Sequence, residues 1–362
     1  MPRRASSGGQ GVSLSGPTEF EAVAADDGLA GSGLQGDGNP APDATAPGIA
    51  GRSLWAIAWR RLRRDKLALA GGVVIVLFIL AAVFADPLAA LYLNIVGRGS
   101  ETFATAHNTP PRNVLDELTL LPVGAFSGAS AKFWLGVTPQ AGLDILTNLL
   151  YGARTSLVIA GLATALSLVL GVLAGVIAGF YRGWIDGVLS RIMDVLLSFP
   201  TLLFSLALVS VSSIITTSSF ARYAVIVFVL GFFSFPYIGR IVRGQVLSLR
   251  EKEFVEAARS LGAGNARIMF REIAPNLVGP ILVYTTLAIP NNILGEAGLS
   301  FLGVGVVPPT PSWGQMLSDA GGFIQVDPFY IFLPGLAIFI TVLAFNLFGD
   351  GLRDALDPKA RR

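Results

Sequence analysis

The sequence lacks most of the residues on which metal and redox chemistry depend. None of its 362 residues is a cysteine, and it has one histidine, His107. The lack of cysteine excludes disulfides, iron–sulfur clusters and thiol nucleophiles, and a single histidine excludes zinc motifs built on two. No G-x-x-x-x-G-K-S/T phosphate loop is present, so the chain has no ATP site of that kind. We expect His107 to be an exposed turn residue, and we expect no catalytic, cofactor or metal site.

Charged residues are also scarce. They make up 14% of the chain, and hydrophobic residues make up 52%, whereas soluble domains carry about 25% charged residues. The composition is that of a membrane protein. The lipid bilayer is therefore an expected partner, and nucleic acid is not.

Long apolar runs in the sequence also indicate a membrane protein. Crossing about 30 Å of hydrocarbon takes roughly 20 helical residues, and runs of that length occur six times. The third and fourth contain Pro200 and Pro236, which kink a membrane helix but do not forbid it. The predicted spans are 67–86, 155–180, 188–212, 222–243, 277–299 and 329–349.

The distribution of basic residues predicts the orientation. Lys and Arg are enriched in cytoplasmic segments, and all but five of the 26 bases fall on one side of the predicted spans. Both termini are therefore expected in the cytoplasm. The five bases on the outer side are Arg98, Arg112, Lys132, Arg154 and Arg222.

The spans divide the chain into segments of different character. Residues 1–50 are rich in Gly, Ala, Ser and Pro, and we expect a disordered cytoplasmic tail because they have little apolar surface to bury. Residues 51–86 read as a basic interfacial helix followed by the first span. Residues 87–150 form a long extracytoplasmic insertion, 151–350 the core with five helices, and 351–362 a cytoplasmic C-terminal tail.

An inner loop, 244–275, shows helical periodicity. Ser248 and Glu251 have the spacing of a capping box, so we expect an amphipathic helix over 249–261. One stripe of this helix carries Phe254, Ala257, Ala258 and Leu261.

The same loop contains signals for a turn and a second helix. Gly262 is expected to end the first helix in the left-handed conformation, and Asn265 to cap a helix over 266–273 that Pro275 terminates. A surface helix lying on lipid headgroups would have the same periodicity. The acids mixed with its bases favour a protein partner, because an anionic leaflet repels acids.

Polar residues within the predicted spans need a reason, because an ionisable group in hydrocarbon is costly. Asp194 stands three residues after Arg191, and an intrahelical ion pair is the simpler explanation; a place on a polar pathway is the other. Asn291 and Asn292 follow a proline and precede Glu296, which suggests a break in the helix. Irregular backbone at membrane depth faces protein or a water-filled cavity, so we place these residues on the translocation route or at its outer gate. A purely structural kink is the alternative.

The inner loop resembles the EAA loop of type 1 ABC-transporter permeases, on the strength of Glu256, Ala257, Ala258, Gly262 and Pro275. Further motifs make the chain similar to the C-type subunit of the dipeptide, oligopeptide and nickel permease family, over about 53–358. They lie at 149–157, 194–200, 299–305, 308–314 and 345–354. The chain departs from the family at Glu272 and Ala274 and in its longer outer loop.

The resemblance implies an all-α, polytopic membrane protein with six transmembrane helices and the type 1 ABC importer permease fold. It implies a cytoplasmic (inner) membrane of a prokaryote, a homologous permease partner, two ATP-binding subunits that hold ATP and Mg, and an extracytoplasmic substrate-binding protein. The loop residues Glu256 to Gly262 would couple to the ATPase. Hydrolysis would not occur on this chain, and peptides are the expected substrate.

Two other classes of protein stay open at this point. A gradient-driven secondary transporter or channel would need a relay of intramembrane acids or bases, but Asp194 and Glu296 lie toward opposite faces. A membrane scaffold would have no evident use for the mixed-charge inner loop.

Overall fold

The computed structural model describes residues 54–101, 114–215 and 218–356. The tail at 1–50, His107 and the final residues 357–362 lie outside the described residues, so the expectations for them stay predictions. The chain divides into residues 1–51 and 52–362, and the second unit is described below. Its described part consists of helices and irregular segments, without named strands.

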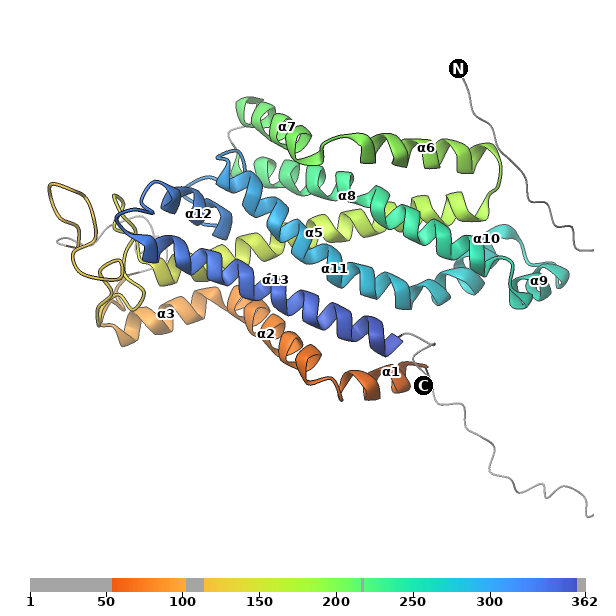
Figure 1. Cartoon of the computed structure of the whole chain (residues 1–362), viewed down its shortest axis with the longest axis horizontal. Coiled ribbons are helices and arrows are strands. Elements are labelled where there is room, and N and C mark those ends of the chain that lie inside the picture. The colour runs from red at the N-terminus through yellow and green to blue at the C-terminus, as the bar shows by residue number, and fades with distance from the viewer. Residues whose placement is uncertain (1–53, 102–113, 216–217, 357–362) are drawn as a thin grey trace, which may run out of the picture. The chain divides into compact units, whose positions relative to one another are not determined.

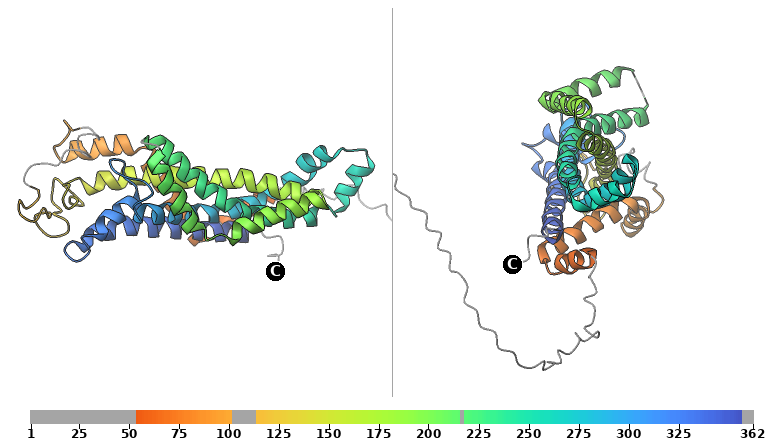
Figure 2. Two further views of the ribbon diagram at one scale, coloured as in Figure 1. Left: turned by 90° about the horizontal axis from the view of Figure 1, so that it is seen from above. Right: turned by 90° about the vertical axis from the view of Figure 1, so that its right-hand side faces the viewer.

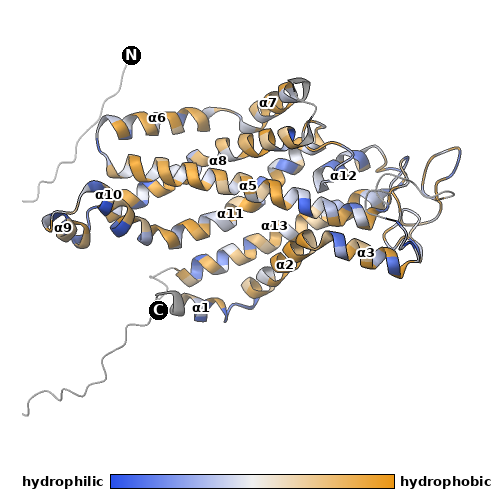
Figure 3. Ribbon diagram, turned by 180° about the vertical axis from the view of Figure 1, so that it is seen from behind, coloured by the Kyte–Doolittle hydropathy of each residue, from blue (hydrophilic) through white to orange (hydrophobic). Residues whose placement is uncertain are grey.

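Five helices in the described residues are long and apolar enough to cross a membrane. They run beside one another in Figure 1, and most of their residues have hydrophobic colours in Figure 3. This confirms the predicted all-α, polytopic fold. The five are α2 (Lys66–Val83), α5 (Ile145–Phe180), α8 (Ser219–Leu249), α11 (Ala274–Phe301) and α13 (Pro328–Leu356).

The predicted third span is a bent pair of helices. α6 (Trp184–Ser198) and α7 (Thr201–Ile215) meet at an angle of 83°. Pro200 lies in the break, where its ring and missing N–H prevent a continuous helix. α7 consequently turns across the neighbouring helices (Figure 2). Six spans result if the pair crosses the membrane once, and five if it does not.

α5 begins earlier than the sequence predicts. Its N-cap is Asp144, whose Oδ1 accepts hydrogen bonds from the N–H groups of Leu146 and Thr147 at 3.0 and 3.3 Å. With 36 residues and a rise of 1.5 Å per residue, α5 is about 54 Å long. Since about 20 residues cross the hydrocarbon, the first turns of α5 extend beyond it.

α5 and α8 pack closely through glycines. Gly171, Gly175 and Gly179 stand one turn apart on α5 and face α8. A Cβ atom placed on Gly175 would lie 2.6 Å from the carbonyl oxygen of Gly239 and 2.7 Å from the Cβ of Val242. The absence of side chains here lets the two backbones approach, as small-residue motifs do in membrane helix pairs.

A short helix precedes the first span. α1 (Leu54–Leu62) packs against the end of α13 through Ala58, Leu62 and Ala355. Trp59 is half exposed, and the guanidinium of Arg63 lies 4.8 Å from its ring. These features fit the predicted basic interfacial helix.

Trp313 lies at the centre of the largest core cluster. It begins α12 (Trp313–Gly321), is fully buried, and donates from Nε1 to the carbonyl oxygen of Leu149 at 3.1 Å. Its ring meets that of Phe78 edge to face at 5.6 Å. The cluster joins α12 to α2, α5, α11 and α13.

The region predicted as an extracytoplasmic insertion combines α3 (Ala85–Ile95) with an irregular element over residues 114–144 that contains three isolated bridges. Asp144 ties it to the helices: its Oδ2 accepts from Arg98 Nη1 at 2.7 Å and from the Tyr92 hydroxyl at 2.9 Å. Burial raises the pKa of the Asp144 carboxyl, and the bonds from Tyr92, Thr147 and Arg98 oppose that shift.

Candidate functional site: an elbow at one end of the bundle

The inner loop folds as an elbow between α8 and α11. It consists of α9 (Glu253–Ser260), a turn, α10 (Asn265–Arg267) and a π-helical segment, Ile268–Ile273, that continues into α11. The elbow lies at the end of the bundle opposite residues 114–144 (Figures 1 and 2).

Three details of the predicted elbow are wrong. Asn265 does not cap the second helix, because it is the first residue of α10 and Gly264 is the N-cap. Ser248 lies inside α8, and the N-cap of α9 is Lys252, so the capping box does not form. Pro275 is the second residue of α11 and does not terminate a helix. The chain is helical from Asn265 to Phe301, with π-helical turns over Ile268–Ile273 before this proline.

Gly262 adopts the predicted left-handed conformation, with φ +80°. The N–H of Ala263 donates to the carbonyl oxygen of Ala258, and that of Gly262 to Arg259, both at 3.0 Å. This pair of bonds is a Schellman motif, which satisfies the last carbonyls of α9 and fixes the direction in which the chain leaves it.

One face of the elbow is buried against the bundle. Val255, Ile268 and Ile273 are fully buried in a cluster that includes Val246 of α8 and Leu277 of α11. The elbow is therefore packed on the helices it connects, and its orientation is set by this apolar contact.

The opposite face is exposed and mixed in character. Glu256, Ala257 and Gly262 are exposed, Ala258 is half-buried, and Leu261 exposes 88% of its surface. The stripe predicted from periodicity thus splits: Ala258 contacts the bundle, whereas Phe254, Ala257 and Leu261 face outward. Phe254 and Leu261 therefore leave apolar surface exposed beside the charges of Glu256 and Arg259.

Arg250 anchors the start of the elbow. Its Nη1 donates to the carbonyl oxygens of Gly179 and Phe180, at 3.0 Å each, which are among the last carbonyls of α5. Glu251 pairs with Arg182 in the α5–α6 turn. Arg243 binds both oxygens of Asp186 on α6, at 2.6 and 2.8 Å.

These anchoring residues were not singled out from the sequence. A basic residue directly after a long apolar helix was the available signal, but its partners come from a helix some 70 positions earlier.

Between the anchors lies a cavity of about 420 Å³, lined by Phe180, Tyr181, Arg182, Arg250, Glu251, Arg259 and Asn265.

The polar residues predicted for the translocation path fall into two groups, the first of which is partly exposed. Asp194 forms an ion pair with Arg240 of α8, so the predicted pair with Arg191 is wrong. Asn291 is exposed and donates from Nδ2 to the carbonyl oxygen of Leu287 at 3.0 Å. α11 runs unbroken through this position, so the predicted break in the helix is also wrong.

The second group is buried. Asn292 donates from Nδ2 to Thr164 of α5 at 2.8 Å and lies 3.4 Å from the Ser234 hydroxyl of α8. Glu296 is 0% exposed, and its two oxygens accept from Ser156 at 2.8 Å and Ser300 at 2.7 Å. Both residues hold α11 to its neighbours.

Glu296 also belongs to a larger polar cluster. The N–H of Trp313 donates to Ser156 Oγ at 3.2 Å, and the N–H of Gln315 donates to the Ser312 hydroxyl at 3.1 Å. The cluster therefore fixes the start of α12 against α5 and α11.

A bundle of apolar helices with a mixed-charge elbow at one end defines a membrane permease of the type 1 ABC fold. The chain belongs to the family of binding-protein-dependent transport system inner membrane components, whose model matches residues 171–362. Residues 53–111 match the N-terminal transmembrane domain of oligopeptide transport permease C.

Similar proteins cover most of the chain. It is 40% identical to the dipeptide transport system permease protein of Alkalihalophilus pseudofirmus, over 85% of this chain and 91% of that one. It is 39% identical to the glutathione transport system permease protein of Shigella flexneri, over 86% and 92% respectively. The similarity therefore includes both the bundle and the elbow.

Proposed function

We propose that this chain is one membrane subunit of an ATP-driven importer that moves di- or oligopeptides after an extracytoplasmic binding protein delivers them. The names of its relatives, dipeptide and glutathione transport permeases, support a peptide substrate. The sequence has no phosphate loop of its own, so ATP and Mg would be held by two partner ATP-binding subunits. A homologous permease would complete the membrane part.

The proposed orientation puts the elbow in the cytoplasm. Arg240, Arg243, Arg250, Arg259 and Arg267 lie at or near the elbow, and cytoplasmic segments are enriched in such bases. Both termini would then be cytoplasmic, residues 114–144 would face outward, and the membrane would be the cytoplasmic membrane of a prokaryote.

The elbow would transmit the movement of the ATP-binding subunit. Glu256, Ala257 and Leu261 present an exposed face to a partner, while Val255 and Ile268 fix the other face to the bundle. Closure of the ATPase would move the elbow as a rigid body, and α8 and α11 would follow. The left-handed turn at Gly262, closed by two backbone hydrogen bonds, is the observation that carries this proposal.

The path residues take different roles in this proposal. Asp194 is partly exposed and Asn291 is exposed on this chain, and both would face the route or the partner permease. Asn292 and Glu296 are buried and would keep the lining helices in register.

The coupling proposal is tested by Gly262→Val in the reconstituted transporter. Valine is strained at φ +80° by about 1–3 kcal/mol, so the elbow would lose its shape. Gly264→Val is the matched control, because Gly264 has φ −70° and ψ 159°, which suit valine, and an added Cβ would have nothing within 4 Å. We expect the first variant to insert normally but lose substrate-stimulated ATPase activity, and the second to keep it.

The outcome discriminates between mechanisms. Normal substrate-stimulated hydrolysis in Gly262→Val would contradict the elbow as coupling element. Peptide uptake driven by an ion gradient in the absence of ATP would instead favour the secondary transporter or channel. Uptake of a radiolabelled dipeptide, compared with the free amino acids, tests the substrate class.

A further inference from the structure

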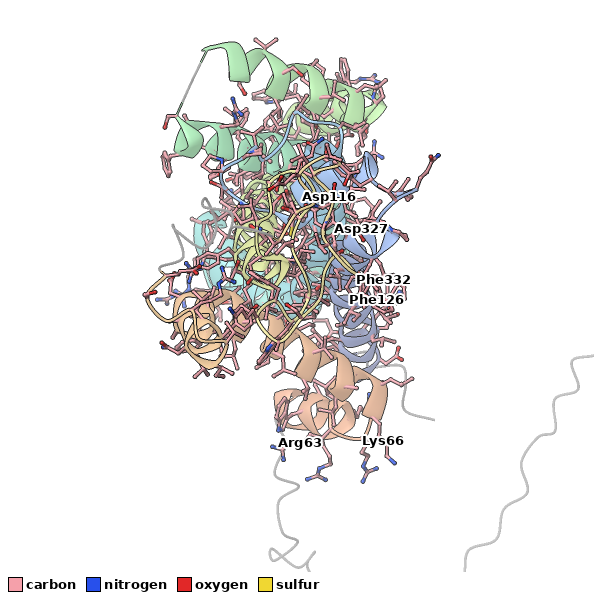
Figure 4. All side chains as sticks on the ribbon, turned by 90° about the vertical axis from the view of Figure 1, so that its left-hand side faces the viewer. Arg63, Lys66, Asp116, Phe126, Asp327 and Phe332 are labelled. Carbon is pink, nitrogen blue, oxygen red and sulfur yellow. The ribbon has the colours of Figure 1, made fainter. Side chains whose placement is uncertain are left out.

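A cavity of about 520 Å³ lies at the end of the bundle opposite the elbow, between the irregular element and the start of α13. It is distinct from the elbow and from the polar residues of the bundle interior. Its walls include Ser127, Asp327 and three aromatic residues, Phe126, Phe329 and Phe332. Figure 4 shows Asp327, Phe126 and Phe332 at this end of the molecule.

The carboxyl group of Asp327 is buried and only half satisfied. The residue is 8% exposed, and its Oδ1 accepts from the Ser127 hydroxyl at 2.9 Å. Its Oδ2 accepts no hydrogen bond from any group in the described residues, and no Lys or Arg among them forms an ion pair with it. An unpaired buried carboxylate is costly, so a partner from outside this part of the chain would be favourable.

A helix-capping role does not account for this carboxylate. Asp327 directly precedes Pro328, the first residue of α13, and the helix dipole favours a negative charge there. A capping side chain, however, accepts from backbone N–H groups of the first turn. Oδ2 makes no such bond, and Oδ1 is bonded to Ser127 on another element.

The aromatic residues of the cavity suit a cation. The rings of Phe126 and Phe329 meet edge to face, with centroids 5.3 Å apart. Phe126 and Phe332 are more than half exposed, so their rings are accessible. Aromatic faces attract ammonium groups through their quadrupole.

The loop that carries Phe126 is strained. Phe126 and Ser127 have φ of 52° and 55°, a region that side-chain-bearing residues rarely adopt. Backbone conformations of this kind are concentrated at functional sites. Here they place a phenyl ring and the hydroxyl that supports Asp327 on the same cavity.

We propose that this cavity binds a primary alkylammonium group, with the ammonium on Oδ2 of Asp327 and the alkyl part against Phe126 and Phe332. A charge-assisted bond of this kind would satisfy the buried carboxylate. The amino terminus of a peptide and the ethanolamine headgroup of a lipid both present this chemistry. The site does not depend on the proposed transport function.

The first test titrates n-butylammonium chloride into the purified complex in detergent, observed by saturation-transfer NMR, with n-butanol as the uncharged comparison. Asp327→Asn keeps the acceptor for Ser127 but removes the charge. Glu117→Gln is the matched control, since Glu117 is an exposed acid of the same element. We expect n-butylammonium to bind and n-butanol not to, Asp327→Asn to weaken binding at least tenfold, and Glu117→Gln to have no effect.

Equal binding of n-butylammonium to Asp327→Asn and the unmodified complex would overturn the proposal, as would equal binding of n-butanol. If Asp327→Asn does not fold, Phe126→Leu and Phe332→Leu provide the test, because they leave the carboxylate in place. Unchanged binding in both of those variants would equally overturn it.

The second test distinguishes the two sources of the ammonium group, a peptide amino terminus and a lipid headgroup. A dipeptide with a free amino terminus should displace n-butylammonium and its N-acetylated form should not, if the source is a peptide. Phosphatidylethanolamine nanodiscs should block the probe and phosphatidylglycerol nanodiscs should not, if the source is a lipid. Because the readout is binding, loss of transport with intact binding would count against the proposed function and leave this site standing.

Discussion

The guanidinium of Arg250 donates to the carbonyl oxygen of Gly179 at 3.0 Å and so joins the beginning of the elbow to the end of α5. The same nitrogen reaches the carbonyl of Phe180. These carbonyls lie at a helix end, where they lack helical partners. A single side chain therefore satisfies the end of one span and positions the loop that follows another.

Arg250→Met is expected to loosen the elbow. Its side chain is 7% exposed, and loss of its bonds leaves partly buried carbonyls unsatisfied, at about 1–3 kcal/mol. Membrane insertion should be retained, while substrate-stimulated ATPase activity of the reconstituted complex should fall. Arg353→Met, an exposed base of α13 outside the elbow, is the control. Full stimulation in Arg250→Met would show that this anchor is dispensable.

The close packing of α5 and α8 predicts opposite effects for two similar substitutions. Gly175→Ala places a methyl group 2.6 Å from the Gly239 carbonyl oxygen, so the helices must separate and the melting temperature should drop. Gly161→Ala, in the same helix, meets nothing within 4 Å. It should be neutral or stabilising by up to about 1 kcal/mol, because alanine favours helix. Equal melting temperatures for the two variants would contradict the packing.

Glu296 is expected to matter for stability through its hydroxyl partners. Glu296→Ala leaves Ser156 and Ser300 without the acceptor they share, at about 1–3 kcal/mol for each buried group. Glu296→Gln keeps one acceptor oxygen and the side-chain shape, so it should destabilise less. Thermal unfolding of the purified complex measures both, with Asp350→Ala, an exposed acid of α13, as control. A larger loss for the glutamine variant would refute this account.

The junction of α3 and α5 should weaken in acid. The hydrogen bond from the Tyr151 hydroxyl lowers the pKa of Asp86 most, and the bond from Arg154 lowers it further. Arg154 Nη2 lies 2.9 Å from Asp86 Oδ2. Since the folded pKa lies below the unfolded value of about 3.9, this stabilisation is complete above that value and lost as pH falls through the folded pKa.

The effect should be small, below about 1 kcal/mol, because Asp86 is mostly exposed and solvent screens the pair. Asp86→Asn should therefore lower the melting temperature slightly at pH 7, and the difference from the unmodified protein should shrink toward pH 3. A difference independent of pH would show that charge is not involved.

Features that depend on neighbouring residues along the chain were predictable. The apolar runs located the membrane helices, because hydropathy over 20 residues is a property of the segment itself. Gly262 was predicted to be left-handed because a glycine after a helix is favoured in that conformation. The motif around Glu256 and Ala257 indicated the family, which the comparisons confirmed.

Features that depend on contacts between distant segments could not be predicted from the sequence. The partner of Asp194 is Arg240 of another helix, whereas spacing alone pointed to Arg191. Asn291 and Asn292 looked like a break, yet α11 continues through them, with the side chain of Asn292 bonded to Thr164 on α5. The local signals predicted that Pro275 ends a helix, whereas it is the second residue of α11.

The sequence by itself determined the class of this protein: a polytopic, helical membrane permease with a mixed-charge elbow. The tertiary structure decided which face of the elbow is free, what anchors Arg250, and that the Oδ2 atom of Asp327 is buried without a partner among the described residues. The physical reason is that hydropathy and turn preferences act over one or two turns of chain. Burial and hydrogen-bond satisfaction depend on which distant helices meet.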